Sequence, residues 1–258
     1  MINGTARIAF AALAILFGGS SLAACESSQS KNEKLKAQGA GLEQEKGVAV
    51  AEANPTVKAV EETSITDENG TAVIVRLKST DSRDQVDLPV IFDLADASGQ
   101  SVGDNATPGI QRTLTHATVV PGKSETWWVN DQVVAAGEAS KVTVKVGRSE
   151  TPVPKSIPDF KPTPPVLKND PVDGIVASGK ATNPTATEQR KVLITIVATK
   201  GKKVVAAGRG VIAKLKPNKA ARYSVFFIGN PKGAKLEISA TPTLFEGAPD
   251  SPDAMGTQ

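Results

Sequence analysis

The sequence predicts an all-β fold made of two tandem antiparallel β-sandwiches. Three observations favour this class. Apolar and polar residues alternate over short stretches, as they do in strands with one buried face, and no stretch of any length has a helical period. Turns rich in glycine and proline separate these stretches, in a chain with 22 glycines and 17 prolines. The same succession of strand and turn signals occurs twice, which indicates an internal duplication.

The first 24 residues predict a signal for export. Arg7 and the amino terminus supply positive charge, residues 8–17 form an apolar core, and residues 18–24 are mostly small. Glycines and serines at 18–21 interrupt the apolar run before it reaches the ~20 residues that span a bilayer. A permanent transmembrane helix is therefore the weaker interpretation, and we expect the mature chain to begin at Cys25.

The run Leu22-Ala23-Ala24-Cys25 resembles the lipobox of bacterial lipoproteins. In that family the cysteine is linked to diacylglycerol through a thioether and becomes the first residue. The resemblance implies a lipidated Cys25, palmitate among its acyl chains, and a location on the extracytoplasmic face of the cell membrane. More than one acyl chain makes such an anchor stable. The alternative is an ordinary secretory signal followed by an unrelated cysteine.

Cleavage after residue 24 of the 258 would leave 234 residues, the length of about two small domains. We expect a polar tether over 25–56, a first sandwich over 57–147 and a second over 172–241, with a disordered tail over 242–258. Between them, residues 148–171 are rich in proline and predict an extended linker that could span on the order of 60 Å. The alternative is a proline-rich strand laid across the surface of a domain.

The repeated elements run in the same order in both halves. Each half has a first alternating strand that ends in a glycine turn, then a proline-containing turn, a strand with aromatic residues and a closing strand. Three anchors link the copies: Gly99 with Gly201, Pro121 with Pro217, and Val142 with Leu236. The corresponding strands are residues 86–94, 127–129 and 142–146 in the first half and 192–198, 223–225 and 236–240 in the second, and 73–78 is a further strand of the first half.

Residues 92–96, read Phe-Asp-Leu-Ala-Asp and followed by Gly99, resemble the signature of FxLYD domains, with Ala95 in the place of the tyrosine. The second copy, residues 196–201, keeps the strand and the glycine turn without the Phe, Leu or Asp. The resemblance covers residues 57–147 and 172–241. It implies an immunoglobulin-like β-sandwich used in extracytoplasmic modules that have no assigned catalysis.

The residues that commonly carry catalysis or metals are few. His116 is the only histidine, and it lies in a polar stretch without a G-x-S-x-G sequence nearby, so we expect an ordinary exposed histidine. Two methionines, one histidine and one acylated cysteine are too few for a zinc or copper site. Asp81, Asp84 and Asp87 lack the spacing of a calcium loop and are interpreted as a solvated turn. The sequence thus predicts a protein without enzymatic activity, metal or cofactor.

Two adjacent tryptophans in a strand must face opposite sides. The alignment of the copies places Trp127 with Tyr223 and Trp128 with Ser224. We therefore expect Trp127 in the core and Trp128 on the surface, where its indole would contact a sugar or a protein partner. The alternative is that the linker or a loop covers Trp128.

Charge divides unevenly between the halves. Residues 57–147 hold 8 Lys and Arg against 13 Asp and Glu, whereas residues 172–241 hold 13 against 3. A basic exported domain is expected to meet anionic wall polymer, phospholipid headgroups or another envelope protein, and not nucleic acid. The alternative is a surface that serves only solubility. The turns that hold the candidate contacts are expected at one end of the second sandwich: Lys200, Lys202, Lys203, Lys216 and Lys219.

Together these features predict a membrane-anchored, non-catalytic interaction module. A structural stalk without a specific ligand fits the linker and the duplication as well. An envelope enzyme, or an accessory to one, is the less favoured alternative.

Overall fold

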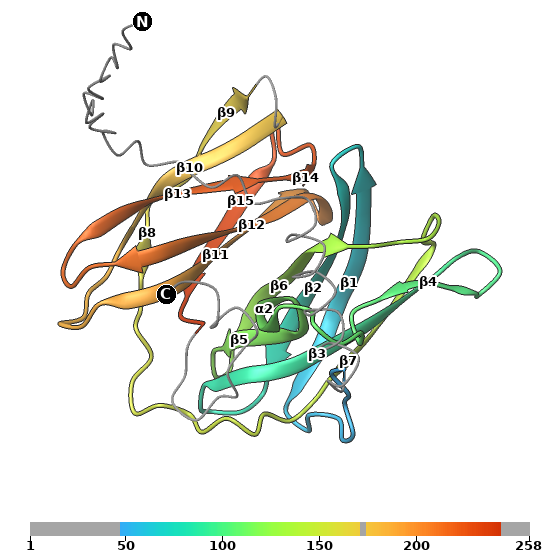
Figure 1. Cartoon of the computed structure of the whole chain (residues 1–258), viewed down its shortest axis with the longest axis horizontal. Coiled ribbons are helices and arrows are strands. Elements are labelled where there is room, and N and C mark those ends of the chain that lie inside the picture. The colour runs from blue at the N-terminus through green and yellow to red at the C-terminus, as the bar shows by residue number, and fades with distance from the viewer. Residues whose placement is uncertain (1–46, 171–173, 244–258) are drawn as a thin grey trace, which may run out of the picture. The chain divides into compact units, whose positions relative to one another are not determined.

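The computed structural model describes residues 47–170 and 174–243, which confirm the predicted all-β antiparallel class (Figure 1). The predicted signal peptide, the lipobox with Cys25, most of the tether and the tail beyond residue 243 lie outside the described residues. The elements of the N-terminal half are β1 (Val57–Asp67), β2 (Gly70–Ser79), β3 (Gln85–Ala95), β4 (Ser101–Asp104), α2 (Arg112–Thr115), β5 (His116–Val120), β6 (Glu125–Val133) and β7 (Lys141–Val146). Those of the C-terminal half are β8 (Lys161–Pro162), β9 (Val166–Asp170), β10 (Gly174–Thr182), β11 (Gln189–Lys200), β12 (Lys203–Leu215), β13 (Ala220–Phe226), β14 (Ile228–Gly229) and β15 (Lys235–Thr241).

The N-terminal half is two sheets around one core. Strands β1, β2 and β6 form one sheet, and β3 pairs with β4, β5 and β7 in the other. The inward residues of β2 and β3, such as Val75 and Val90, meet between the sheets together with Phe92 and Trp128. Alternation along residues 86–94 places every second side chain in this core, as the sequence predicts.

The C-terminal half repeats this arrangement. Strand β10 pairs with β13, β8 and β9, while β11 and β12 pair along their length and are flanked by β15 and β14. The core between these sheets contains Ile194, Ile196 and Tyr223, and it also contains Phe160 from the predicted linker. Because β8 and β9 pair with β10, residues 160–170 belong to this sandwich. Residues 160–170 of the predicted linker therefore match the alternative of a proline-rich strand laid on a domain, and not the extended linker.

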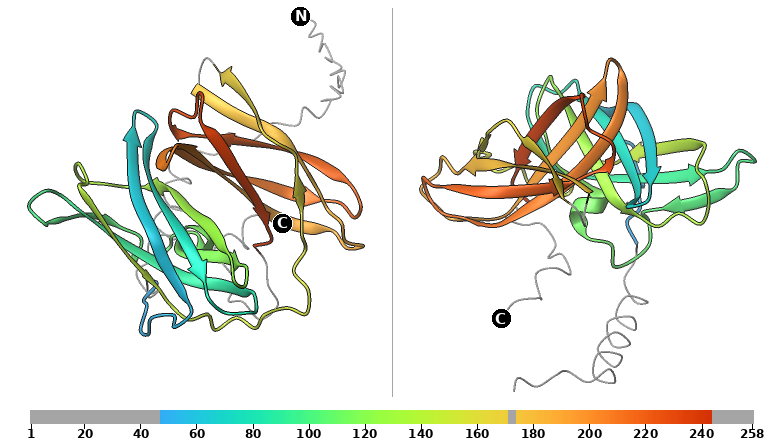
Figure 2. Two further views of the ribbon diagram at one scale, coloured as in Figure 1. Left: turned by 180° about the vertical axis from the view of Figure 1, so that it is seen from behind. Right: turned by 90° about the horizontal axis from the view of Figure 1, so that it is seen from above.

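A third apolar cluster joins the two halves. Ala72, Ile74 and Val129 on the outer face of β2 and β6 pack against the outer face of β11, β12 and β14. Figure 2 shows β1 and β2 beside these strands. Val73, Ile74 and Val75 are consecutive and all fully buried, because β2 has a core on each face. The halves therefore pack directly against each other and do not stand apart on an extended spacer.

Polar contacts accompany this third cluster. The Arg209 Nε donates to Oδ1 of Asp131 at 2.8 Å, and the Arg209 backbone N–H donates to Oδ2 at 2.9 Å. The second guanidinium nitrogen, Nη1, donates to the carbonyl of Thr113 at 3.0 Å. The Asp67 carboxylate accepts the backbone N–H of Gly229 at 2.7 Å. Here acids of the N-terminal half meet donors of the C-terminal half, so part of the charge asymmetry is used inside the molecule.

The predicted orientation of the two tryptophans is wrong. Trp128 is 4% exposed, lies in the core beside Phe92, and donates its indole N–H to the carbonyl of His116. It pairs with Val75 on β2, just as the buried Tyr223 pairs with Gly179 on β10. Trp128 and Tyr223 are 95 residues apart, whereas the two turn prolines used for alignment are 96 apart. A slip of one residue exchanges the two faces of a strand.

Backbone geometry explains the slip. In the two proline-containing turns, the residues with positive φ are Lys123 (48°) and Asn218 (52°), again 95 residues apart. Pro217 therefore corresponds to Gly122 and not to Pro121. Asp87 (57°) and Lys191 (50°) form a second such pair, each the third residue of its strand. The four positive-φ residues other than glycine in the described chain thus fall at two equivalent places.

Trp127 lies at the contact between the halves. The guanidinium of Arg76 stacks 4.2 Å from its ring centroid, and its indole N–H donates to Glu237 at 2.9 Å. The hydrogen bond from Trp127 is the main cause that lowers the pKa of Glu237. Trp127 is half-buried, packs against the cluster between the halves, and bonds to the C-terminal half through Glu237.

We predict that Trp128→Ala lowers the free energy of unfolding by about 3–5 kcal/mol, because it empties the centre of the first core. Trp127→Ala should cost less, about 1–2 kcal/mol, since its ring is only partly buried. Urea unfolding followed by far-ultraviolet circular dichroism measures both. A larger loss for Trp127→Ala would contradict the observed facing.

We further predict that Asp131→Ala lowers the free energy of unfolding by about 3 kcal/mol. The Asp131 and Arg209 side chains are 16% and 6% exposed, and the substitution leaves the guanidinium buried without its partner. Glu188→Ala is the matched control, because Glu188 forms an exposed pair with Arg190 that contributes well under 1 kcal/mol. Equal effects of the two substitutions in urea unfolding would show that the ion pair of Asp131 with Arg209 contributes no more to stability than an exposed pair.

Candidate functional site

The first candidate site lies where a segment of the N-terminal half, between β4 and β5, leaves the sheet. In the C-terminal half β12 is one strand that pairs with β11 along its length, with one register shift at Ala198, whereas its counterpart in the N-terminal half is divided into β4 and β5. The segment between them contains α2, and this helix presents Arg112 toward β3. Asp87 on β3 has a left-handed backbone and is buried, with 4% exposure.

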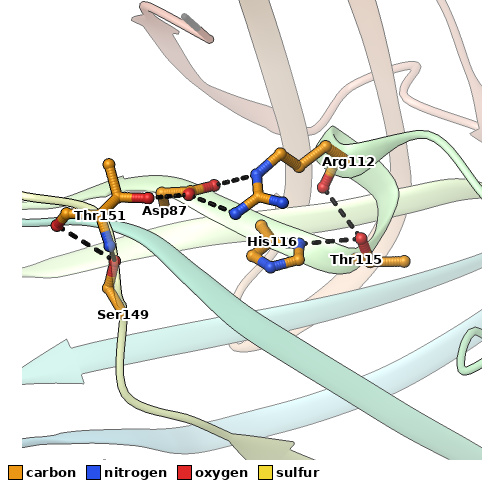
Figure 3. A network of polar contacts seen from close by, with 6 residues as sticks. All are labelled: Asp87, Arg112, Thr115, His116, Ser149 and Thr151. Carbon is orange, nitrogen blue, oxygen red and sulfur yellow. Dashed lines mark hydrogen bonds and ion pairs between the residues drawn. The ribbon is translucent and has the colours of Figure 1, made fainter. Parts of the chain in front are cut away.

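Asp87 and Arg112 form a two-pronged ion pair (Figure 3). The Arg112 Nε donates to Oδ1 at 2.7 Å and Nη2 donates to Oδ2 at 2.5 Å. The Thr151 hydroxyl donates to the same Oδ2. The carboxylate thus ties the segment after β7 to β3 and α2, and every donor it accepts is supplied by the fold. The prediction that Asp87 belongs to a solvated turn is wrong.

His116 lies beside this pair and is buried, with 8% exposure, which contradicts the expected exposed loop. Its Nδ1 is 2.9 Å from the hydroxyl of Thr115. Burial, reinforced by the neighbouring positive charge of Arg112, lowers the pKa of the imidazole from 6.5 to about 4, although the Asp87 carboxylate acts in the opposite direction. The ring is therefore neutral at pH 7.

These side chains border a cavity of about 610 Å³. Its walls also include residues 48–52 and 147–150, with the exposed ion pair of Glu52 and Arg148 at its edge. The Asp87 carboxylate bonds to Arg112 and Thr151 and makes no hydrogen bond to the imidazole. The acid-to-imidazole bond that orients a catalytic histidine is thus not formed by this pair. The contacts account for a role in holding the fold.

The other two predicted turn acids lie apart from Asp87. Asp81 accepts the backbone N–H of Arg83 at 3.0 Å, and Asp84 accepts that of Gly122 at 2.9 Å. Both shape exposed loops. Within residues 47–170 and 174–243, no group of three or more histidine, cysteine or acidic side chains is placed to hold a metal ion.

The second candidate site is the set of lysine turns, and the structure separates them. Lys200, Lys202 and Lys203 lie at the turn between β11 and β12, while Lys216 and Lys219 lie at the turn between β12 and β13. The 13 residues of β12 separate the turns by about 40 Å at the rise of an extended strand. The prediction that all five emerge at one end is wrong, because β12 runs the full length of the sheet between them.

The two turns have different surroundings. Lys202 and Lys203 border a groove of about 440 Å³ whose opposite wall is β1, with Glu61 and Glu62. Burial raises the pKa of Glu62. The positive charge at this end therefore faces acids of the same chain.

At the other end the cations face one another. Arg190 pairs in register with Lys214, and Lys180 pairs with Arg222, so like charges stand directly across from each other on two strand pairs. Lys216 and Lys219 add to this end and are exposed. Cross-strand pairs of like charge destabilise a sheet by roughly 0.2–1 kcal/mol each. Arg190 also forms an exposed ion pair with Glu188, whereas no ion pair among the described residues involves Lys180 or Arg222.

Sequence reasoning missed Arg112, Arg209, Lys180 and Arg222. The charges of Lys180 and Arg222 were counted, but their pairing depends on the register of β10 with β13, which the sequence does not display. Trp128, the predicted surface contact, is in the core and cannot bind a ligand.

Comparison with known proteins returned no match to any family model and none to a curated protein. In the described part of the chain, no helix has the length and apolar character needed to span a membrane.

We predict that the stability of the protein falls as the pH is lowered from about 6.5 to about 4. In this range the unfolded chain protonates His116 and the folded chain does not, so proton uptake favours unfolding. The loss should be about 2–3 kcal/mol. His116→Gln should remove this part of the pH dependence while the contribution of the carboxyl groups stays. Urea unfolding of both proteins between pH 4 and pH 8 is the measurement, and parallel stability curves would refute the assignment.

Proposed function

We propose that this protein is a lipid-anchored extracytoplasmic lipoprotein whose folded part is a non-catalytic binding module for anionic components of the envelope. The observation that carries the proposal is the outward pair of like charges, Lys180 and Arg222, which stand directly across from each other on the C-terminal half. The sequence at Leu22 to Cys25 supports the anchor, and the net charge of residues 172–241 supports an anionic partner.

The fold supports a module of two related sandwiches. The same order of strand pairing in both halves and the two equivalent positions of positive φ favour an internal duplication. The resemblance of residues 92–96 to the FxLYD signature fits this proposal. The direct packing of the halves disfavours a stalk, since a spacer gains reach from keeping its domains apart.

The Asp87, Arg112 and His116 network supports the module in another way. Its charges are satisfied within the fold, so they hold the loops of the N-terminal half and leave the outward cations of the C-terminal half as the groups available to a partner. Anionic phospholipid headgroups and anionic wall polymer both satisfy the charge requirement.

We predict that Cys25→Ser abolishes lipid attachment and moves the protein out of the membrane fraction or leaves its signal uncleaved. The reason is that the thioether needs the cysteine sulfur. Metabolic labelling with a fatty-acid analogue, followed by fractionation, measures both effects. The control is Ser27→Ala, which should keep the label. Undiminished label on the Cys25→Ser protein would exclude the lipid anchor.

A further inference from the structure

The outer face of the sheet formed by β9, β10 and β13 combines cations with exposed apolar side chains. Because neighbours along a strand face opposite sides, the buried Ala177, Ala181 and Tyr223 define the inner face of this sheet. The charged and large apolar residues at alternate positions define the outer sheet face: Val166, Lys168, Asp170, Val176, Lys180, Arg222 and Phe226.

The register sets these residues in rows across the sheet. Val176 on β10 pairs with Phe226 on one side and with Lys168 on the other. Two residues further along, Ser178 pairs with Val166, and beyond it Lys180 pairs with Arg222. Lys168 therefore stands in the same row as Val176 and Phe226, and the pair of Lys180 and Arg222 stands two rows away, beyond Val166.

The apolar part of this face is exposed. Phe226 is 48% exposed and Val166 is 59% exposed, and Phe226 is the one aromatic side chain among the exposed large hydrophobic residues of the described chain. Its backbone is held firmly, since β13 lies close on β12: a Cβ added at Gly208 would overlap the carbonyl oxygen of Phe226. The ring thus projects from a fixed strand, and nothing in the described chain covers it fully.

The charged side chains of β9, β10 and β13 on this face are three cations and one acid. No ion pair among the described residues involves Lys168, Lys180 or Arg222. The acid is Asp170, which lies on the same face two residues from Lys168, opposite Gly174, so the positive charge of the face exceeds the negative by two. The opposed pair of Lys180 and Arg222 repel each other unless an anion lies over them.

We propose that the outer sheet face rests on an anionic lipid bilayer, with Lys168, Lys180 and Arg222 on the headgroups and Phe226 in the interfacial layer. This deepens the proposed function, on which it rests, by choosing phospholipid as the anionic partner. A polymer of charged units would match the cations and leave Phe226 without a counterpart, whereas a bilayer surface offers both anionic groups and an apolar layer.

A second copy of the chain fits this face poorly. A twofold contact would set the three cations of one copy against the same three of the other. The predicted anchor favours the bilayer further. The residues between Cys25 and Gly47 span at most about 80 Å when extended, so the body stays close to the membrane and even weak contacts act at high effective concentration.

The test uses the mature full-length chain carrying Cys25→Ser, so that the lipid anchor does not contribute. Vesicles of phosphatidylcholine with about one third phosphatidylglycerol, and vesicles of phosphatidylcholine alone, are sedimented with the protein over a salt series. We expect binding to the anionic vesicles that weakens steeply as salt rises. The triple variant Lys168→Gln, Lys180→Gln and Arg222→Gln should lower the partition coefficient by on the order of a hundredfold.

The matched control removes the same charge elsewhere in the same half: Lys200→Gln, Lys202→Gln and Lys203→Gln. This control should lower the partition coefficient several-fold less than the triple variant of the outer sheet face does. Circular dichroism and urea unfolding establish that both variants are folded. Equal losses for the two variants, or no preference for anionic vesicles, would overturn the proposal. Binding to soluble anionic wall polymer that competes fully with the vesicles, or a stable dimer in light scattering, would do so as well.

Insertion of the aromatic ring is tested separately. In the Cys25→Ser chain, Phe226→Cys provides a single thiol for an environment-sensitive dye, and Val211→Cys is the control, because Val211 is 58% exposed on β12 and lies outside the face. Anionic vesicles should shift the emission of the dye at position 226 to the blue and leave it nearly unchanged at 211. Equal shifts would contradict the orientation. Fatty-acid labelling of Cys25 stays an independent result, so loss of the anchor and loss of the face can be told apart.

Discussion

The structure depends on one constraint: four sheets must share three apolar layers. The sheet of β1, β2 and β6 and the sheet of β11, β12, β14 and β15 both have a core on one side and the cluster between the halves on the other. Strands buried on both faces become continuous apolar runs, which is why Val73, Ile74 and Val75 all lie at zero exposure. Among the described residues, the other two sheets have no apolar cluster on their outer face, and the outer sheet face of the C-terminal half is one of those.

The same constraint explains where the charges go. Groups near the shared layers are paired within the chain, as Arg209 is with Asp131 and Trp127 is with Glu237. A buried charge without a partner is costly, so the fold supplies one wherever water is excluded. Cations on the free sheet face remain in water and need no partner for folding. On the outer sheet face of the C-terminal half these cations are Lys168, Lys180 and Arg222.

The Asp87 network is a buried titratable cluster whose charges are paired within the fold. The carboxylate is saturated by Arg112 and Thr151, and the imidazole of His116 is kept neutral by burial. Such a cluster stiffens the loops that flank β3 and makes folding sensitive to acid. Its cavity and low imidazole pKa follow from packing in a half whose second sheet is interrupted by α2.

The alternating patterns in the sequence determined the all-β class and which side chains of the segment 86–94 face the core, because a pleated strand with one buried face imposes a period of two. Composition also determined the opposite charges of the halves. The facing of Trp127 and Trp128 was decided by the turn before β6, where a one-residue difference between otherwise similar copies exchanges the inward and outward faces of the strand. The partners of Asp87, Arg209 and Lys180 were decided only by tertiary structure, since each lies tens of residues away in the chain and is brought close by sheet register. Local patterns record which side of a strand is buried, and only the packed fold records what buries it.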